Sequence, residues 1–341
     1  MPKKVITFGE IMLRLMPEDG YRLLQNENLR ATFGGGEANV AVSLANYGED
    51  AAFVTALPDN AIGDAAIRDL RSFGVDTSMI LRQGDRLGVY YVEKGQSQRP
   101  STVLYDRKNS SVAEASHEDF DWMKIFENAD WFHFTGITPA LSPELFAACM
   151  EACRAARKMG VTVSCDLNYR KKLWTTEEAR NAMSQLMPYV DICIANEEDA
   201  DKVLGIRAED TDVTAGKLSE EGYCRVAAEI SARYHCKAVA ITLRTSISAS
   251  DNRWAGLLYC NGQCFLSRTY DVRLWDRVGG GDSFGGGLIY ALHHNYEPQE
   301  AVEFAVAASC LKQTLQGDFN RVTVKEVKNL AGGDGSGRVV R

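Results

Sequence analysis

Residues 276–288 read Asp-Arg-Val-Gly-Gly-Gly-Asp-Ser-Phe-Gly-Gly-Gly-Leu. The first three glycines are followed by Asp282 and then by an apolar run that includes Leu288 and Ile289, which predicts a tight turn opening directly into a buried helix. Free N–H groups at the start of a helix, together with its axial dipole, favour an anion such as phosphate. Asp282 would lie beside that anion and could accept the proton of an attacking hydroxyl group. This stretch therefore predicts phosphoryl transfer.

A simpler interpretation makes these glycines a connection that packs a helix against a strand, with Asp282 as the N-cap. Three consecutive glycines, however, cost more backbone entropy than an ordinary turn requires. Two other glycine-rich loops are excluded, because there is no G-x-x-x-x-G-K-[ST] motif and none of the triple-glycine runs completes G-x-G-x-x-G. A Walker-type nucleotidase and a hydride-transferring Rossmann enzyme are therefore disfavoured.

The overall composition is that of a globular protein with acidic charge. The chain has 341 residues, of which 45% are hydrophobic and 25% charged, and its net charge is −8. This charge disfavours nucleic acid and anionic membranes as partners, so an anionic substrate would need local arginines. No run is apolar enough to span a bilayer and the N-terminus lacks a signal-peptide pattern, so we expect a cytoplasmic protein.

The nine cysteines are scattered through apolar patterns, which is typical of small buried thiols in a reducing compartment. Two C-x3-C pairs are weak metal signals. Cys149 and Cys153 lie one helical turn apart among alanines, whereas Cys260 and Cys264 flank an Asn-Gly hairpin. Neither pair has a matching second half, so no metal site is predicted from them.

Strand and helix patterns alternate along most of the chain, which predicts an α/β fold with a mainly parallel sheet covered on both faces. The expected strands are 5–8, 11–16, 52–56, 131–134, 161–165, 191–194 and 238–243, with a hairpin at 255–266. The expected helices are 61–73, 143–159, 176–186, 197–204, 220–234, 282–293 and 298–314, with a further helix after the second triple glycine at 34–36. Ligands of such sheets gather at the carboxyl ends of the strands.

The alternation is interrupted between residues 87 and 111. Two aromatic-rich segments, 88–93 and 102–107, predict antiparallel strands separated by a polar stretch, and with 11–16 they could form a small separate sheet. A small sheet near a pocket can act as a lid, although an ordinary hairpin excursion is the alternative. We therefore expect one domain, 1–330, with a β lid formed by about 11–33 and 87–111, and a flexible tail at 331–341.

Two glycine signatures, Gly34-Gly-Gly-Glu-Ala-Asn39 and Asp276-Arg-Val-Gly-Gly-Gly-Asp-Ser-Phe284, make the chain similar to the ribokinase-like (PfkB) family of carbohydrate kinases over nearly its whole length. The family pattern has Thr and Ala where this chain has Arg277 and Gly280. These departures, and segments 10–17, 136–141 and 317–320, resemble the subgroup that phosphorylates 2-keto-3-deoxygluconate. The resemblance implies a central parallel sheet with helices on both faces and a small β lid.

The resemblance also implies catalytic roles. Asp282 would be the base for the sugar hydroxyl, and the amides of Gly279, Gly280 and Gly281 would hold the transferring phosphoryl group. An aspartate at a helix N-terminus is expected to be ionised and weakly basic, so positioning should matter more than base strength.

Sugar-binding residues are implied by the same resemblance. They are Gly34, Gly35, Tyr90, Tyr105, Arg107, Arg170 and Asp318. The lid residues among them would close over the sugar. Arg170 follows a predicted strand end and could bind either a substrate carboxylate or nucleotide phosphates, since a planar guanidinium suits both anions.

Nucleotide contacts are implied at Asn168, Asn196, Thr242 and Arg244. Magnesium should accompany ATP by bridging phosphate oxygens, without a dedicated protein cage. The family's Asn-x-x-Glu element is matched by Asn196 to Asp199, with the shorter acid at the last position.

The resulting hypothesis is an ATP-dependent kinase that phosphorylates the terminal hydroxyl of 2-keto-3-deoxygluconate. A fructokinase or another sugar kinase of the family is the alternative; a sugar acid needs a cationic partner such as Arg107 or Arg170, whereas fructose does not. A non-catalytic sugar-binding regulator on the same fold is a third reading, opposed by the intact Asp282. The expected partners are the sugar acid, ATP and a second copy of the chain in a homo-oligomer.

Overall fold

A computed structural model describes residues 4–196, 198–207, 220–335 and 337–338. Its main sheet has ten strands, and parallel pairing runs from β11 through to β5. In sheet order the strands are β13 (Gln263–Leu266), β12 (Asp251–Cys260), β11 (Ala238–Ser246), β10 (Ile192–Asn196), β9 (Thr162–Asp166), β8 (Ala129–Thr135), β1 (Lys4–Phe8), β4 (Ala51–Leu57) and β5 (Ile80–Arg82), with β14 (Tyr270–Arg273) beside β12.

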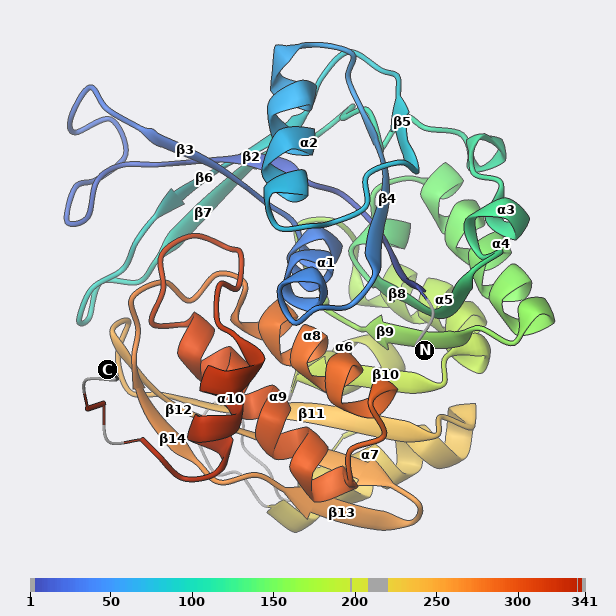
Figure 1. The fold of residues 1–341 in the computed structure, drawn as a ribbon, viewed down its shortest axis with the longest axis vertical. Coiled ribbons are helices and arrows are strands. Elements are labelled where there is room, and N and C mark those ends of the chain that lie inside the picture. The colour runs from blue at the N-terminus through green and yellow to red at the C-terminus, as the bar shows by residue number, and fades with distance from the viewer. Residues whose placement is uncertain (1–3, 197, 208–219, 336, 339–341) are drawn as a thin grey trace.

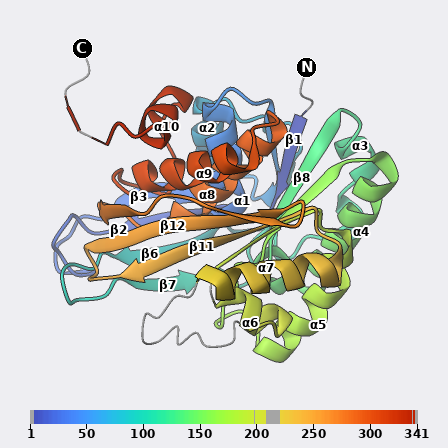
Figure 2. The same cartoon turned by 90° about the horizontal axis from the view of Figure 1, so that it is seen from below.

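Helices cover both faces of this sheet, as Figure 2 shows from below. One face carries α1 (Gly36–Asn46), α2 (Ala61–Ser72), α8 (Gly280–His293), α9 (Pro298–Lys312) and α10 (Val324–Ala331). The other face carries α3 (Trp122–Ile125), α4 (Pro143–Met159), α5 (Thr176–Leu186), α6 (Asp199–Leu204) and α7 (Glu220–Tyr234). Neighbouring residues of β1 belong to the hydrophobic cores on opposite faces of the sheet: Val5 packs with residues of α8 and α9, whereas Ile6 packs with residues of α4. The doubly covered parallel sheet predicted from the sequence is confirmed.

A second, four-stranded sheet projects from the main body (Figure 1). Its order is β3 (Arg30–Gly34), β2 (Met12–Met16), β6 (Gly88–Glu93) and β7 (Thr102–Asp106). The predicted antiparallel pair 88–93 and 102–107 is confirmed, as is its association with 11–16. We call this four-stranded sheet the lid.

Several elements were not predicted. The strands β3, β5 and β14 and the helix α3 span five residues or fewer and carry mixed burial, so no apolar periodicity marks them. Helix α10 has two signals that were overlooked. Val324, Val327 and Leu330 recur at helical spacing, and Thr323 and Glu326 form a capping box at its start. Helix α8 begins at Gly280 with Gly279 as its N-cap, so the alternative in which Asp282 is the N-cap is wrong.

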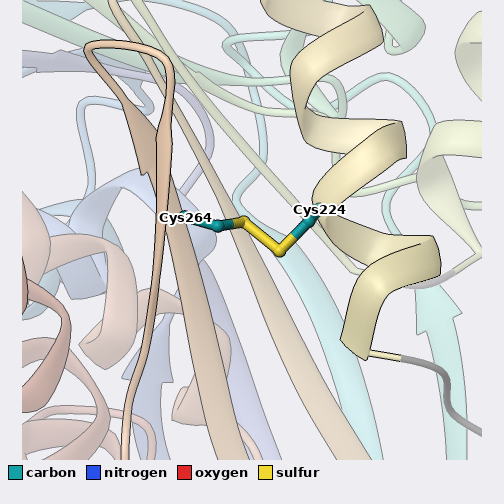
Figure 3. Close-up of a disulfide and its surroundings, with 2 residues drawn as sticks. All are labelled: Cys224 and Cys264. Atoms are coloured by element: carbon teal, nitrogen blue, oxygen red, sulfur yellow. A yellow bond between two sulfur atoms is a disulfide. The ribbon is translucent and has the colours of Figure 1, made fainter.

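The structure also corrects the description of two cysteines. Cys224 of α7 and Cys264 of β13 form a disulfide with a Cα–Cα distance of 6.0 Å (Figure 3). The prediction of free buried thiols is therefore wrong for this pair, because folding brings α7 beside a hairpin that lies 40 residues further along the chain. It is confirmed for the seven other cysteines, which are buried and unpaired.

The predicted tail 331–341 is described only in part. Ala331 is the last residue of α10, and the N–H of Asp334 donates to the carbonyl of Asn329. Residues 336 and 339–341 lie outside the described part of the chain. Among the described residues, no helix combines the length and the hydropathy that crossing a membrane requires.

Candidate active site

A cleft of about 470 Å³ lies where the carboxyl ends of the parallel strands meet the lid and the start of α8. Every site residue predicted from the sequence lines it: Gly34, Gly35, Tyr90, Tyr105, Arg107, Asn168, Arg170, Asn196, Thr242, Arg244, Gly279, Gly280, Gly281, Asp282 and Asp318. Residues from opposite ends of the chain are thus brought to one place, as expected for a parallel sheet.

In the glycine turn before α8, Gly279 packs too closely for any other residue. Gly279 has φ 81°, and a Cβ there would lie 2.2 Å from the carbonyl oxygen of Asp318. The N–H of Gly280 donates to the carbonyl of Arg277 at 3.2 Å. Within the described part of the chain, the N–H groups of Gly279 and Gly281 have no acceptor. The turn therefore presents two free donors beside a helix N-terminus, which suits an anion.

Asp282 lies in the first turn of α8 and faces the start of α1. Its carboxylate accepts a hydrogen bond from the Nδ2 of Asn39 at 2.6 Å. Burial raises the pKa of the Asp282 carboxyl to about 6, while the bond from Asn39 partly offsets this and the charge of Asp318 adds to it. The expectation of a weakly basic aspartate is therefore wrong, because the effect of burial exceeds that of the hydrogen bond from Asn39 and of the nearby cations. A group with this pKa is well matched to accepting a proton near neutral pH.

The second glycine run is equally tight. A Cβ on Gly34 would lie 2.2 Å from the Asp318 carboxylate, and one on Gly35 would lie 1.9 Å from the carbonyl oxygen of Glu10. A side chain at either position would therefore collide with the Asp318 carboxylate or with the main chain of Glu10.

The lid contributes an aromatic and charged wall. The Tyr90 hydroxyl donates to the Asp318 carboxylate at 2.6 Å, and the Tyr105 ring stacks on Tyr90 with centroids 6.0 Å apart. The Arg107 guanidinium forms an ion pair with the buried Glu10, with its Nε 2.8 Å from Oε2. Arg107 is thus already paired, and a substrate carboxylate would share it with Glu10.

Arg170, by contrast, is exposed in the cleft and makes no ion pair among the described residues. Its Nη1 donates only to the neighbouring carbonyl of Tyr169 at 3.2 Å. Its charge acts on two carboxyls of the cleft, since it partly offsets the burial that raises the pKa of Asp166 and of Asp282. Arg170 is therefore a cation with free donors for an incoming anion.

Sequence reasoning missed Arg14, a fully buried arginine on β2. Its Nη2 lies 2.6 Å from the Asp276 carboxylate, and its Nη1 donates to Asp318. One signal for it was available, because strand alternation puts Arg14 on the same buried face as Met12 and Met16. Arg14 joins the lid to the glycine turn and to the 317–320 loop.

Two further arginines line the cleft. Arg277 and Arg244 both face it, and burial together with the nearby charge of Arg244 lowers the pKa of Arg277. Among the described residues neither arginine is in an ion pair. Arg277 was noted in the sequence only as a departure from the family pattern, yet two guanidinium groups side by side favour phosphate groups between them.

Local hydrogen bonds fix the main chain that follows β9 and β10, where nucleotide contacts are expected. Asn168 has φ 39° and its N–H donates to Asp166 at 3.1 Å. The Asn196 side chain accepts the N–H groups of Glu198 and Asp199. Burial, with the charges of Asp199 and Asp282 adding to it, raises the pKa of Asp166 well above its ordinary value. A cation bound with the nucleotide would relieve this repulsion, although no three His, Cys, Asp or Glu side chains of the described residues converge as a metal cage.

Comparison with known proteins adds the family. The model of the pfkB family carbohydrate kinases matches residues 2–323. The chain belongs to the pfkB family of carbohydrate kinases. The resemblance seen in the two glycine signatures is confirmed, and this carbohydrate kinase transfers a phosphoryl group to a sugar hydroxyl.

Three relatives illustrate the likeness of the kinase to known proteins. A crystal structure of 2-dehydro-3-deoxygluconokinase from Thermotoga maritima is 52% identical, with a TM-score of 0.94 and coverage of 98% of this chain and 99% of that one. A 2-dehydro-3-deoxygalactonokinase from Haloferax volcanii is 32% identical, with 98% of each chain covered. A fructokinase from Xylella fastidiosa has a TM-score of 0.75 over 96% of this chain and 98% of that one, but at 21% identity it shows only the shared ribokinase-like fold.

Proposed function

We propose that this kinase transfers the γ-phosphate of ATP to the terminal hydroxyl of 2-keto-3-deoxygluconate, also named 2-dehydro-3-deoxygluconate. The observation that carries the proposal is the placement of Asp282 beside a glycine turn with two free N–H donors, in a cleft that also holds the uncommitted cation Arg170. The 52% identity with the Thermotoga maritima enzyme supports the choice of sugar acid.

In the proposed mechanism, the sugar half of the cleft orients the substrate. The main chain at Gly34 and Gly35, with the Tyr90–Asp318 pair, binds the sugar hydroxyls, and Arg170 binds the carboxylate with help from Arg107. A charge-assisted bond to a carboxylate contributes about 1.5–3 kcal/mol, enough to discriminate an acid from a neutral sugar. Orientation of the terminal hydroxyl towards Asp282 then follows from binding at the other end of the molecule.

Asp282 accepts the proton of that hydroxyl. With a pKa of about 6, the carboxyl is roughly 90% ionised at pH 7 and is still basic enough to take up a proton as the oxygen attacks. The N–H groups of Gly279 and Gly281 stabilise negative charge on the phosphoryl oxygens, and the N–H of Gly280 can join them. The hydrogen bond from Asn39 keeps the carboxylate aimed along the cleft.

The nucleotide half supplies positive charge and polar contacts. Arg244 and Arg277 would bind phosphate oxygens, and Asn168, Asn196 and Thr242 would line the remainder of the nucleotide site. Mg²⁺ bound with the nucleotide would neutralise negative charge on the phosphates. Asp166 and Asp199 are the carboxyls that would face it, directly or through water. Use of ATP as the donor supports the cytoplasmic location inferred from the sequence.

We further propose that residues 1–330 act as one kinase domain with its β lid, and that the protein forms a homo-oligomer through the lid. The edge strand β7 leaves Leu104 49% exposed, which favours pairing with another copy. Sedimentation velocity on the full chain distinguishes a monomer from a homo-oligomer, and a monomer at micromolar concentration would contradict the proposal.

The substrate assignment is tested by ADP release from Mg-ATP with five sugars under identical conditions. The panel is 2-keto-3-deoxygluconate, its C4 epimer 2-keto-3-deoxygalactonate, gluconate, fructose and ribose. We expect kcat/KM to be highest for the first. A higher value for fructose or ribose would retain the kinase and refute the sugar acid, whereas a preference for the epimer would place the chain with the Haloferax volcanii relative.

A further inference from the structure

Lys312, the last residue of α9, is a fully buried lysine beneath the glycine turn. Its Nζ donates to the carbonyl oxygen of Asp276 at 3.2 Å and, at shorter range, to that of Val278. It forms no ion pair with any carboxylate among the described residues. Removing an ammonium group from water costs free energy, and two main-chain carbonyls offset only part of that cost. A functional role would explain why the lysine is buried here.

The geometry of the peptide group links Lys312 to the direction of the Gly279 N–H. In a planar trans peptide the C=O and the following N–H point in opposite directions. When Lys312 holds the carbonyl of Val278 on the protein side, the N–H of Gly279 is directed to the other side, and both Val278 and Gly279 line the cleft. The Gly279 N–H is one of the two free donors of the turn.

Lys312 belongs to a buried group of two cations and two carboxylates, whose formal charges sum to zero. Arg14 is engaged by the carboxylates of both Asp276 and Asp318, and Lys312 is the second cation beside the same two acids. Burial lowers the pKa of Lys312, while the charges of Asp276 and Asp318 act in the opposite direction and favour its protonated form. The carboxylate of Asp276 also accepts the N–H of Gly317, so the turn is fixed from several sides.

We propose that Lys312 is a positioning residue for phosphoryl transfer. Its ammonium group holds the carbonyls of Asp276 and Val278 so that the turn presents its N–H groups to the transferring phosphoryl group, and its fixed charge adds to the attraction for that anion. The inference rests on the proposed role of the turn as the phosphoryl-binding element.

The test is chemical rescue of Lys312→Ala. We expect kcat to fall about 100-fold or more, comparable to the loss of an oxyanion donor, while KM for the sugar changes less than about threefold. Ammonium or methylammonium should enter the vacated space and restore kcat at least about tenfold, and tetramethylammonium, which is too large and has no N–H donor, should not. The wild type, whose site the lysine fills, should not respond.

Two further variants separate the roles of donor and charge. Lys312→Gln retains an N–H donor without the charge, so its kcat should lie between those of the wild type and Lys312→Ala. Lys325→Ala is the matched control, because Lys325 is an exposed lysine of α10, and its kcat should equal that of the wild type.

Titration with the non-hydrolysable analogue Mg-adenylyl imidodiphosphate makes the test independent of the sugar. Lys312→Ala should bind it at least about tenfold more weakly, with recovery in ammonium. Unchanged affinity and kcat in folded Lys312→Ala or Lys312→Gln, or a loss that no small amine relieves, would overturn the inference. A wild type that binds the analogue but phosphorylates none of the sugars would refute the proposed function instead.

Discussion

The buried arginine Arg14 permits a stringent test of how the lid is joined to the glycine turn. It is fully buried and bonded to two carboxylates, so Arg14→Met leaves Asp276 and Asp318 with only Lys312 to compensate them. Removing one partner from a buried ionic group costs about 3–5 kcal/mol. With an unfolding entropy of about 2.1 cal/mol/K per residue over this chain, the free-energy loss corresponds to a decrease in Tm of roughly 4–7 °C.

The assay is thermal and urea unfolding of Arg14→Met beside the double variant Arg14→Met/Asp318→Asn. The double variant restores the charge balance of one lysine and one aspartate, so it should regain much of the lost stability although its sugar site is damaged. Arg68→Met is the control, since Arg68 is exposed and has no ion pair among the described residues. A Tm decrease no larger than that of the control, or a double variant less stable than the single one, would refute the reasoning.

Three more predictions concern the reaction. Asp282→Asn should lower kcat by about 10²–10⁴-fold with sugar affinity, measured by calorimetry, largely retained; equal activity would remove Asp282 as the base. Because the ionised carboxyl is the active form and its pKa is about 6, kcat/KM should decrease tenfold per pH unit below that value and level off above pH 7, whereas a flat profile from pH 5 to 7.5 would be inconsistent with this role. Arg170→Met should raise KM for 2-keto-3-deoxygluconate about 10- to 100-fold and leave KM for a neutral sugar unchanged; an equal effect on both would show that Arg170 does not bind the carboxylate.

The regular elements could be predicted because their signals are local. Helices such as 143–159 and 176–186 have apolar faces and clear end signals, and the structure gives them those bounds. Short strands such as β5 and β14 gain their stability from a partner strand far along the chain, so their own sequence carries little indication of them.

The site residues were found mainly through two glycine signatures and the family that they resemble. What the sequence could not show is which charges neutralise one another. The pairing of Arg107 with Glu10 and the bridge from Arg14 to Asp276 and Asp318 depend on three-dimensional contacts between distant segments. The pKa of Asp282 is similarly a product of burial in the folded cleft and not of its position in the helix alone.

Identification of the reaction product tests the central claim most directly. The protein is incubated with Mg-ATP and 2-keto-3-deoxygluconate until turnover is complete, ADP is quantified, and the phosphorylated carbon is located by ³¹P–¹H correlation NMR. We predict one phosphate ester per ADP, attached at the terminal carbon. Free phosphate in place of the ester, or an ester at another carbon, would contradict the account.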